Sequence, residues 1–300
     1  MNAAANTLVP RGNLLLDEPM LKHTSWRIGG PADRYYQPAD VADLSVFLSQ
    51  LADAEPLFWL GLGSNLLVRD GGIRGTVIAT SGVMNGLELK GDNTVRAEAG
   101  VACAKVARFC ARAGLKGAEF LAGIPGTMGG ALAMNAGAFG GETWNVVAAV
   151  QTITRQGQLQ RRSADEFDVA YRQVVMPENE GFVAAELTLE TGGQPEQLLA
   201  DIKDLLNKRG SSQPTQLPNA GSVFRNPEGD FAARLIEVCG LKGASEGAAC
   251  VSDKHANFII NTGGATAFDV ENLIERVAQT VLQKESVQLH REVHIVGEVK

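Results

Sequence analysis

Hydrophobic and polar positions along the chain switch repeatedly between helical and strand periodicity, which predicts a mixed α and β fold. Helical spacing is expected over 40–54, 101–113, 198–209, 231–239 and 268–284. Short apolar runs bounded by turn residues predict strands at 76–79, 84–89, 94–99, 182–190, 257–261 and 287–296. The segment PLFWLGLGSNLLVRD over 56–70 predicts two short strands on either side of a glycine-rich turn. A further hairpin is expected over 146–162, around Gln156-Gly157.

The order of these elements predicts a poorly ordered arm, two mixed α/β units and an α+β unit. The arm covers residues 1–20, and the units cover 21–80, 81–192 and 193–300. The last boundary rests on the turn-rich segment TGGQPEQ over 191–197. About 100 residues after it are enough for a separate domain.

Composition excludes several classes of protein. Of the 300 residues, 45% are hydrophobic and 20% charged, which excludes a disordered chain. The net charge of −7 argues against a general nucleic-acid binder or a membrane-surface protein. The chain has neither a secretory signal nor an apolar run of spanning length, so we expect a cytoplasmic protein. Its four cysteines form no C-x-x-C pair and are expected to be free thiols, with no metal site.

Glycine is concentrated in one stretch. Eight of the 34 glycines lie between Gly117 and Gly141, in a segment that is otherwise apolar and nearly uncharged. Glycine is too dense there for a helix or strand, and the segment is too apolar for a linker. The pattern predicts a buried loop system whose backbone comes close to another group.

Two glycine-rich loops are candidates for ligand binding. Gly61-Leu62-Gly63-Ser64-Asn65 is followed by Leu66, so it is not a Rossmann fingerprint, and it carries no Walker lysine. It can form a nest for a diphosphate or a tight turn with a left-handed asparagine. The second loop runs over 122–130 and continues to 135–140, where close backbone packing is the alternative. Together the two loops favour a large ligand such as a dinucleotide.

Several polar side chains in loops or strands have the chemistry of catalysis. They are Arg172 beside Tyr171, Ser222 after a glycine, and Glu292 in the last predicted strand. Each also has an ordinary interpretation: a surface pair, a turn or an exposed strand face. In a regular strand Glu292 would share one side with the histidines at 290 and 294, a spacing that does not indicate a metal site.

Seven segments resemble the UDP-N-acetylenolpyruvoylglucosamine reductases, a family of flavoenzymes in peptidoglycan precursor synthesis. In family order, from about residue 24 to about 298, they are TSWRIGGPADRYYQP, LGLGSNLLVRDGGIRGTVI, GAEFLAGIPGTMGGALAMNAGAFGGE, YRQ, NAGSVFRNP, LKGASEGAACVSDKHANFIIN and REVHIVGE. The resemblance implies an α+β fold. A two-subdomain FAD-binding module of the vanillyl-alcohol-oxidase type over 21–192 would be followed by a C-terminal UDP-sugar-binding domain over 193–300.

The resemblance also implies the cofactors and the residues that hold FAD. NADPH would be a co-substrate, and the two glycine loops would bind the FAD diphosphate and ribityl chain. The implied cofactor-binding residues are Gly61, Gly63, Ser64, Asn65, Leu66, Gly123, Ile124, Pro125, Gly126, Thr127, Gly129, Gly130, Asn135, Ala136, Gly137 and Ala138.

The implied reaction passes a hydride from NADPH to FAD and then to C3 of the enolpyruvyl group, with protonation at C2. Arg172, together with Glu292, would stabilise the negative charge that develops on the substrate, and Ser222 would donate the proton. The UDP-sugar would contact Tyr171, Arg225, Asn226, Arg234 and Lys242. The chain is similar to a shorter subtype, because no long insertion separates Arg172 from Phe182.

Two other functions remain open from the sequence. A flavin-dependent sugar or alcohol oxidase of the same superfamily would share the glycine loops, but is not expected to combine NAGSVFRNP with the terminal EVHIVGE. A non-catalytic flavin or UDP-sugar binder would not need Arg172, Ser222 and Glu292 together. Small-molecule partners are therefore expected, without nucleic acid or membrane; the oligomeric state is left open, and a monomer is compatible with the sequence.

Overall fold

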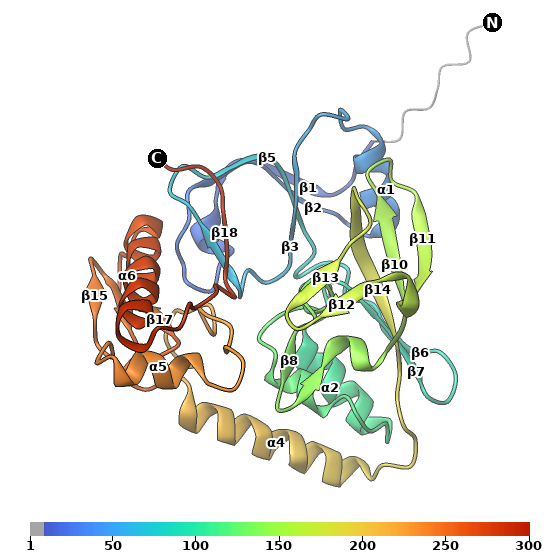
Figure 1. The fold of residues 1–300 in the computed structure, drawn as a ribbon. Coiled ribbons are helices and arrows are strands. Elements are labelled where there is room, and N and C mark those ends of the chain that lie inside the picture. The colour runs from blue at the N-terminus through green and yellow to red at the C-terminus, as the bar shows by residue number, and fades with distance from the viewer. Residues whose placement is uncertain (1–8) are drawn as a thin grey trace, which may run out of the picture. The chain divides into compact units, whose positions relative to one another are not determined.

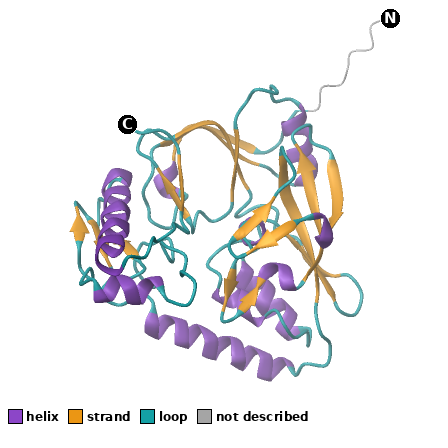
Figure 2. Cartoon of the chain, viewed as in Figure 1, coloured by secondary structure: helices purple, strands orange, loops and turns teal. Residues whose placement is uncertain are grey.

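The computed structural model describes residues 9–300, and the chain divides into two compact units. Unit 1 contains the described part of Met1–Leu15 together with Tyr35–Gly61 and Thr76–Ile202. Unit 2 contains Leu16–Arg34, Leu62–Gly75 and Lys203–Lys300. Figures 1 and 2 show the mixture of helices and strands that the sequence predicted. These units do not follow the predicted limits at 20, 80 and 192, so the predicted functional domains stay a prediction.

Unit 1 contains an antiparallel five-stranded sheet with the order β11-β10-β14-β7-β6. Its strands are β6 (Leu87–Leu89), β7 (Thr94–Glu98), β10 (Val147–Thr154), β11 (Leu159–Ser163) and β14 (Glu180–Thr188). The predicted hairpin is confirmed: β10 pairs with β11, and Gly157 takes a φ of 80° between them. The long helix of this part is α2 (Cys103–Arg112), and the chain leaves it at Gly114, whose φ is 68°.

A second sheet has the order β1-β2-β5-β3. Its strands are β1 (Asn13–Pro19), β2 (Pro31–Gln37), β5 (Ile73–Ala79) and β3 (Leu57–Leu60), and β3 and β5 run parallel. The expectation of a poorly ordered arm is wrong for β1 and for the 3-10 turn Met20–Lys22; residues 1–8 lie outside the described chain. β1 forms because its backbone pairs with a neighbouring strand, although most of its side chains are exposed.

Helix α1 (Val41–Ser49) begins directly after Asp40, its N-cap residue. The Asp40 carboxylate accepts a hydrogen bond from the backbone N–H of Asp43. The buried Asp43 carboxylate in turn accepts from the Tyr36 hydroxyl at 2.6 Å, and Phe47 stacks on the Tyr36 ring. The helix ends at Ser49 instead of residue 54, and the chain turns before Pro56.

Unit 2 contains the helices α5 (Ala232–Val238) and α6 (Ala267–Glu285), which pack together (Figure 1). A small antiparallel sheet joins β15 (Ser245–Glu246), β16 (Ala249–Val251) and β17 (Ile259–Asn261). The fully buried Trp26 belongs to the same core, and its indole N–H donates to the backbone oxygen of Ile259 at 2.8 Å. An N-terminal segment therefore completes the core around the C-terminal helices. Helix α4 (Pro195–Ser212) precedes these elements.

The end of the chain forms less strand than expected. Only β18 (His294–Val296) is regular, and it pairs in parallel with β4 (Leu66–Val68). Before it, the backbone N–H of Glu292 and the backbone oxygen of His290 bond to residues 223 and 225. The prediction of a strand over 287–296 is therefore wrong before His294, and with it the proposed alternation of side chains around Glu292.

The glycine-rich stretch is more regular than the predicted loop system. It contains a 3-10 turn (Glu119–Gly123), helix α3 (Met128–Ala133) and a hairpin of β8 (Gly137–Ala138) and β9 (Gly141–Glu142). A further 3-10 turn covers Thr143–Asn145. Close packing explains the glycines, because a Cβ at Gly129 would lie 2.9 Å from the Ala99 side chain. The prediction of close backbone approach is confirmed, and the exclusion of helix and strand is wrong.

Within residues 9–300, no helix is long and apolar enough to cross a membrane, and no group of side chains has the composition of a metal site. The four cysteines are free. Burial raises the pKa of Cys103 and Cys110 to about 12, which makes both poor nucleophiles at neutral pH.

An ion pair connects the residue after β4 to α6. Arg69 holds Glu271 through Nε at 2.9 Å and Nη2 at 2.7 Å. This hydrogen bonding keeps the pKa of Glu271 below its usual value. A carboxyl with a depressed folded-state pKa adds stability above its unfolded pKa, and this is lost as the pH falls through the folded value.

We therefore predict that Glu271→Gln lowers the free energy of unfolding by about 1 kcal/mol at pH 7. The difference from the unmodified protein should shrink as the pH falls from about 4 through the lower folded-state pKa of Glu271, below which the carboxyl is protonated in both states. Urea unfolding at several pH values measures this, with Glu285→Gln as an exposed control on the same helix. A pH-independent difference would contradict the assignment.

Candidate functional site

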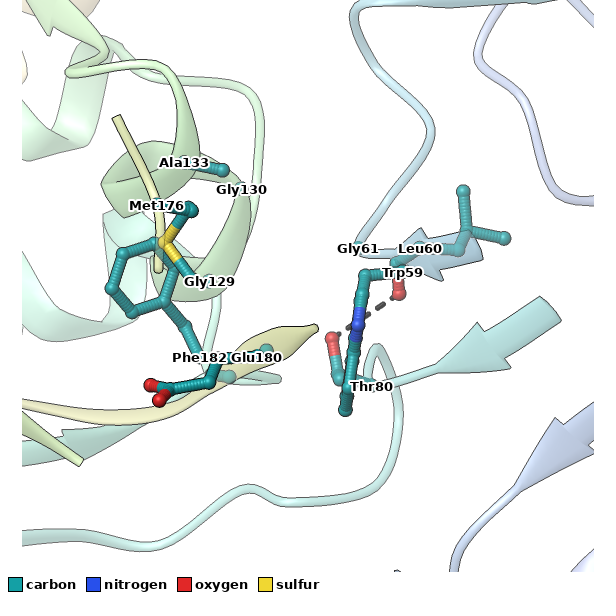
Figure 3. Close-up of a pocket in the computed structure, with 12 residues that line it drawn as sticks. Trp59, Leu60, Gly61, Thr80, Gly129, Gly130, Ala133, Met176, Glu180 and Phe182 are labelled. Atoms are coloured by element: carbon teal, nitrogen blue, oxygen red, sulfur yellow. Dashed lines mark hydrogen bonds between the residues drawn. The ribbon is translucent and has the colours of Figure 1, made fainter. Parts of the chain in front are cut away.

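An open cavity lies within unit 1 (Figure 3). Its volume is about 500 Å³, including the space at its opening to solvent. It is lined by Trp59, Leu60, Gly61, Thr80, Ala99, Gly129, Gly130, Ala133, Met176, Glu180, Gly181 and Phe182. Most of these residues come from the end of β3, from α3 and from the start of β14, and Thr80, Ala99 and Met176 lie just after β5, β7 and β13. Three of them, Gly61, Gly129 and Gly130, are predicted cofactor-binding residues from the two glycine loops. The structure thus brings the first residue of one loop together with the second loop.

Gly61 and Thr127 approach so closely that no side chain fits between them. A Cβ at Gly61 would lie 2.5 Å from the Thr127 hydroxyl oxygen. Thr127 occupies the N-cap position of α3, but its side chain makes no capping bond. Its hydroxyl is buried and has no hydrogen-bond partner within the described chain. A buried unpaired hydroxyl is costly, so this geometry fits a ligand that supplies the missing partner.

The walls of the cavity suit a planar aromatic group attached to a polar chain. Trp59, Phe182 and Met176 provide apolar surface, and the glycines leave backbone groups accessible. The three large side chains were not predicted. Trp59 lies only two residues before Gly61, so its place in a strand that ends at the loop is the signal that could have identified it. Met176 and Phe182 carry no comparable local signal.

Glu180 is also in the lining, but its carboxylate is held by neighbours. Arg162 donates to it through Nε and Nη2, and the Thr152 hydroxyl donates at 2.6 Å. Hydrogen bonding from Arg162 lowers the pKa of Glu180. The carboxylate is therefore ionised at neutral pH and fixed at the wall of the cavity.

The other predicted FAD contacts are not part of the cavity lining. Gly123 is covered by Phe139, whose ring would be 2.4 Å from a Cβ at that position. Ile124 is buried, Pro125 is exposed, and the backbone oxygen of Gly126 accepts a bond from Cys103. The backbone oxygen of Ala136 accepts from both the hydroxyl and the N–H of Thr143.

The rest of the first loop, from Gly63 to Leu66, belongs to unit 2. The left-handed residue is Gly63, with a φ of 67°, and not Asn65, so that detail of the tight-turn interpretation is wrong. The Asn65 amide instead donates to the backbone oxygen of Glu292 at 3.1 Å. Ser64 is half-buried, and Leu66 is buried at the start of β4.

Asn135 and Arg172 meet in a second cluster of unit 1. The two-residue turn between β12 (Asp168–Ala170) and β13 (Gln173–Val175) consists of Tyr171 and Arg172. A 3-10 turn, Ala164–Glu166, precedes this hairpin. Arg172 has a φ of 56°, and Asn135 has a φ of 45°. The guanidinium donates to the backbone oxygens of Asn135 and Gly137. Ala138 follows Gly137 in β8.

Both polar atoms of the Asn135 side chain form hydrogen bonds within the protein. Its amide nitrogen donates to Glu142 at 2.9 Å and to the backbone oxygen of Ala170 at 3.3 Å, and its oxygen accepts from the N–H of Trp144. The residue is 2% exposed. The side chain therefore serves to hold the loop, and a direct contact between its amide and a flavin stays a prediction.

Ser222 and Glu292 are brought together in unit 2. The backbone N–H of Glu292 donates to the backbone oxygen of Val223, directly after Ser222, at 2.8 Å. The buried Asn257 side chain accepts from the N–H of Phe224 and donates to its oxygen, which fixes the loop. The backbones of two segments that lie 70 residues apart in the sequence are thus joined next to the predicted proton donor and at the predicted carboxyl residue.

The predicted substrate contacts have protein partners. Asn226 accepts from the N–H of Ala232 and therefore supports the start of α5. Arg234 pairs with Asp230, which lowers the pKa of that carboxyl to about 2, and Lys242 pairs with Glu237 at 2.8 Å. A phosphate would have to displace these surface carboxylates or share their cations. The Arg225 backbone bonds to His290, and Tyr171 is half exposed.

Arg209, near the end of α4, was missed by the sequence analysis. Its side chain donates through Nε to Gln213 at 2.8 Å, and burial lowers the pKa of the guanidinium. Arg209 is thus a half-buried cation of unit 2 and a further candidate for phosphate binding beside the exposed Arg234. The signal was weak, because Arg209 ends a predicted amphipathic helix and looks like an ordinary cap.

Comparisons with known proteins agree with this geometry. Residues 32–163 match a family described as "FAD binding domain", and residues 213–296 match "UDP-N-acetylenolpyruvoylglucosamine reductase, C-terminal domain". The chain is 58% identical over 297 residues to the UDP-N-acetylenolpyruvoylglucosamine reductase of Alkalilimnicola ehrlichii, with 99% of both chains covered. It is 60% identical over 288 residues to that of Nitrosococcus oceani, with 96% of both chains covered.

Solved structures give the same result for the fold. The reductase from Thermus caldophilus aligns with a TM-score of 0.81 at 33% identity, over 95% of this chain and 98% of that one. An oxidase acting on 6-hydroxy-D-nicotine, from Arthrobacter nicotinovorans, aligns over 96% of this chain and 89% of that one, with a TM-score of 0.55 at 13% identity, which is a likeness of fold alone. These matches confirm the predicted α+β fold with an FAD-binding module and a C-terminal domain. The chain belongs to the UDP-N-acetylenolpyruvoylglucosamine reductase family.

Proposed function

We propose that this protein reduces the enolpyruvyl group of UDP-N-acetylglucosamine-enolpyruvate to UDP-N-acetylmuramate, with NADPH as reductant and FAD as cofactor. The observation that carries the proposal is the glycine-lined cavity of unit 1, in a chain that matches reductases of this name from end to end. The unpaired hydroxyl of Thr127 and the absent side chain at Gly61 fit a diphosphate-containing cofactor. The cytoplasmic location stays a prediction from the sequence.

FAD, when bound, accepts a hydride from NADPH and delivers one to the substrate. The protein's own task is to bind and orient the reactants and to manage charge and protons. Because Gly61, Gly129 and Gly130 have no side chains, the cofactor can approach their backbone closely. Trp59 and Phe182 supply flat apolar surface for a ring. These residues make the cavity wall, so we assign them to cofactor binding.

Arg172 supplies positive charge for the substrate carboxylate and the enolate that forms as C3 receives the hydride. Its guanidinium is fixed on the backbone oxygens of Asn135 and Gly137, so it needs little reorganisation during the reaction. Glu292 is held by its backbone on Val223 and Asn65. We assign to it the stabilisation of the same enolate, as a hydrogen-bond donor in its protonated form.

Ser222 donates the proton that C2 requires. A serine hydroxyl is a weak acid, so it acts only toward a strongly basic carbanion-like centre and in a fixed position. The loop supplies that fixation through Asn257 and through the bond from Glu292 to Val223. Arg209, Arg225 and Lys242 are the cations of unit 2 that we assign to the UDP diphosphate.

The proposal predicts two separable half-reactions in an anaerobic absorbance titration. NADPH should bleach the flavin band, and UDP-N-acetylglucosamine-enolpyruvate should restore it without oxygen. A band that bleaches but returns only with oxygen would identify an oxidase. No flavin band after addition of FAD would contradict the assignment of the cavity.

Ser222→Ala should slow the second half-reaction by about 10²- to 10⁴-fold, because it removes the proton donor. Flavin reduction by NADPH should change by less than about twofold, since that step needs no proton from Ser222. Stopped-flow absorbance measures both steps. Ser211→Ala, an exposed serine whose hydroxyl bonds only within α4 at Lys208, is the matched control. Equal losses in both half-reactions would show that Ser222 is not the proton donor.

A further inference from the structure

We propose that Glu142 is a positioning residue that holds the Arg172 guanidinium through Asn135. The inference rests on the proposed function, because Arg172 is there the residue that stabilises the enolate. It arises from the hydrogen bond between Asn135 and Glu142. Glu142 lies in β9, the second strand of a short hairpin, and Asn135 lies in the loop before β8, its first strand. Neither the glycine pattern nor the reaction chemistry requires this contact.

The hairpin places Glu142 opposite Gly137. Strands β8 and β9 pair Gly137 with Glu142 and Ala138 with Gly141. A Cβ at Gly137 would lie 3.1 Å from Arg172 Nη1 and 3.2 Å from Glu142 Cγ. The Glu142 side chain and the guanidinium therefore lie against the same glycine, and this glycine is what allows both to come so near.

The Glu142 carboxylate accepts a hydrogen bond from the Asn135 side chain. Its Oε2 accepts from the Asn135 amide at 2.9 Å, and Glu142 is only half exposed. Asn135 itself is buried and has a left-handed backbone, with a φ of 45°. Side-chain bonds are what hold a non-glycine residue in this conformation, so Glu142 helps to fix the peptide at Asn135.

That peptide is part of the cradle for Arg172. The Asn135 backbone oxygen accepts from Nη1 at 3.3 Å, and the Gly137 oxygen accepts from Nη2 at 3.1 Å. The Asn135 amide also donates to Ala170, the last residue of β12 before the Arg172 turn. The Asn135 side-chain nitrogen thus bonds to both Glu142 and Ala170, while the Asn135 backbone oxygen holds the guanidinium.

Two further backbone conformations indicate that the surrounding structure fixes the geometry of this cluster. Arg172 has a φ of 56° in its two-residue turn, where glycine or asparagine would be less strained. Phe139, at the tip of the β8–β9 hairpin, has a φ of 53° and packs on Gly123. Three strained non-glycine residues in one cluster are typical of a site whose geometry is imposed by its surroundings.

The test compares Glu142→Ala with Glu142→Gln in the FAD-loaded enzyme. Alanine removes the acceptor for Asn135, whereas glutamine keeps an oxygen acceptor and loses only the charge. We expect alanine to slow flavin reoxidation by UDP-N-acetylglucosamine-enolpyruvate by about ten- to a hundredfold, with flavin reduction by NADPH changed less than about twofold. Glutamine should restore reoxidation to within about threefold. Glu178→Ala, an exposed glutamate of the same unit, is the control.

A double-mutant cycle with Arg172→Ala separates positioning from general destabilisation. If Glu142 acts through Arg172, Glu142→Ala should have no further effect on reoxidation when Arg172 is already alanine. Thermal unfolding of the FAD-free protein gives a readout independent of activity. There Glu142→Ala should lower Tm, and the same change should have little further effect in Asn135→Ala.

Each failure has its own signature. If Glu142→Ala reoxidises like the unmodified enzyme while Arg172→Ala is slow, the inference is wrong and the proposed function stands. If Arg172→Ala itself is fast, the role assigned to Arg172 is wrong. If glutamine is as slow as alanine, Glu142 acts by charge and not by position. Should alanine prevent folding, Glu142→Asp, which withdraws the carboxylate by one methylene, must show a selective loss of reoxidation for the inference to survive.

Discussion

The candidate cofactor site depends on the close approach of the Thr127 side chain to Gly61, which leaves no room for a Cβ at that position. The end of β3 and the residue before α3 come together so that a Cβ at Gly61 would touch the Thr127 hydroxyl. This contact sets the edge of the cavity lined by Trp59, Gly129 and Phe182. It also leaves the Thr127 hydroxyl buried with no partner in the described chain. Protein interiors rarely leave such a group unpaired, so the same constraint that shapes the cavity marks it as a binding site.

Elsewhere the structure uses amides and backbone oxygens to hold reactive side chains. Asn257 clamps the loop of Ser222, and Asn65 and Val223 bond to the backbone of Glu292. In unit 1, Asn135 does the same for the turn of Arg172. Asparagine suits this task because one planar group both donates and accepts. These contacts fix the backbone that carries Ser222 and Glu292 and the turn that carries Arg172.

Much of the fold followed from periodicity and turn residues. The helices α1, α2, α4, α5 and α6, the β10–β11 hairpin and the Asp40 cap were all predictable, because they are local patterns. The terminal strand was overpredicted, because Leu289 and Val293 are buried by tertiary contacts and not by alternation in a sheet. The strand β1 was missed because its exposed side chains carry no pattern, and only pairing with another segment reveals it.

The sequence predicts candidate residues for the site, whose roles stay predictions, but it does not predict how they are arranged in space. Spacing and resemblance identified Gly61, Thr127, Ser222 and Arg172. No pattern in the sequence could show that Trp26 belongs to the core around α6, or that Asn65 bonds to Glu292, since these contacts join residues more than 200 positions apart. Glu142 escaped notice for the opposite reason. It ends a glycine motif whose other residues drew attention, and its partner is only seven residues away.

The most direct measurement is FAD affinity, by fluorescence titration, of Thr127→Val beside the thermal stability of the FAD-free protein. Valine keeps the shape of threonine and removes only the hydroxyl. If that hydroxyl awaits the cofactor, affinity should fall by about ten- to a hundredfold, since a hydrogen bond to a charged group is worth roughly 1.5–3 kcal/mol. The FAD-free protein should be at least as stable as before, because an unpaired buried hydroxyl has been removed. Unchanged affinity together with a lower Tm would contradict the assignment of this cavity to the cofactor.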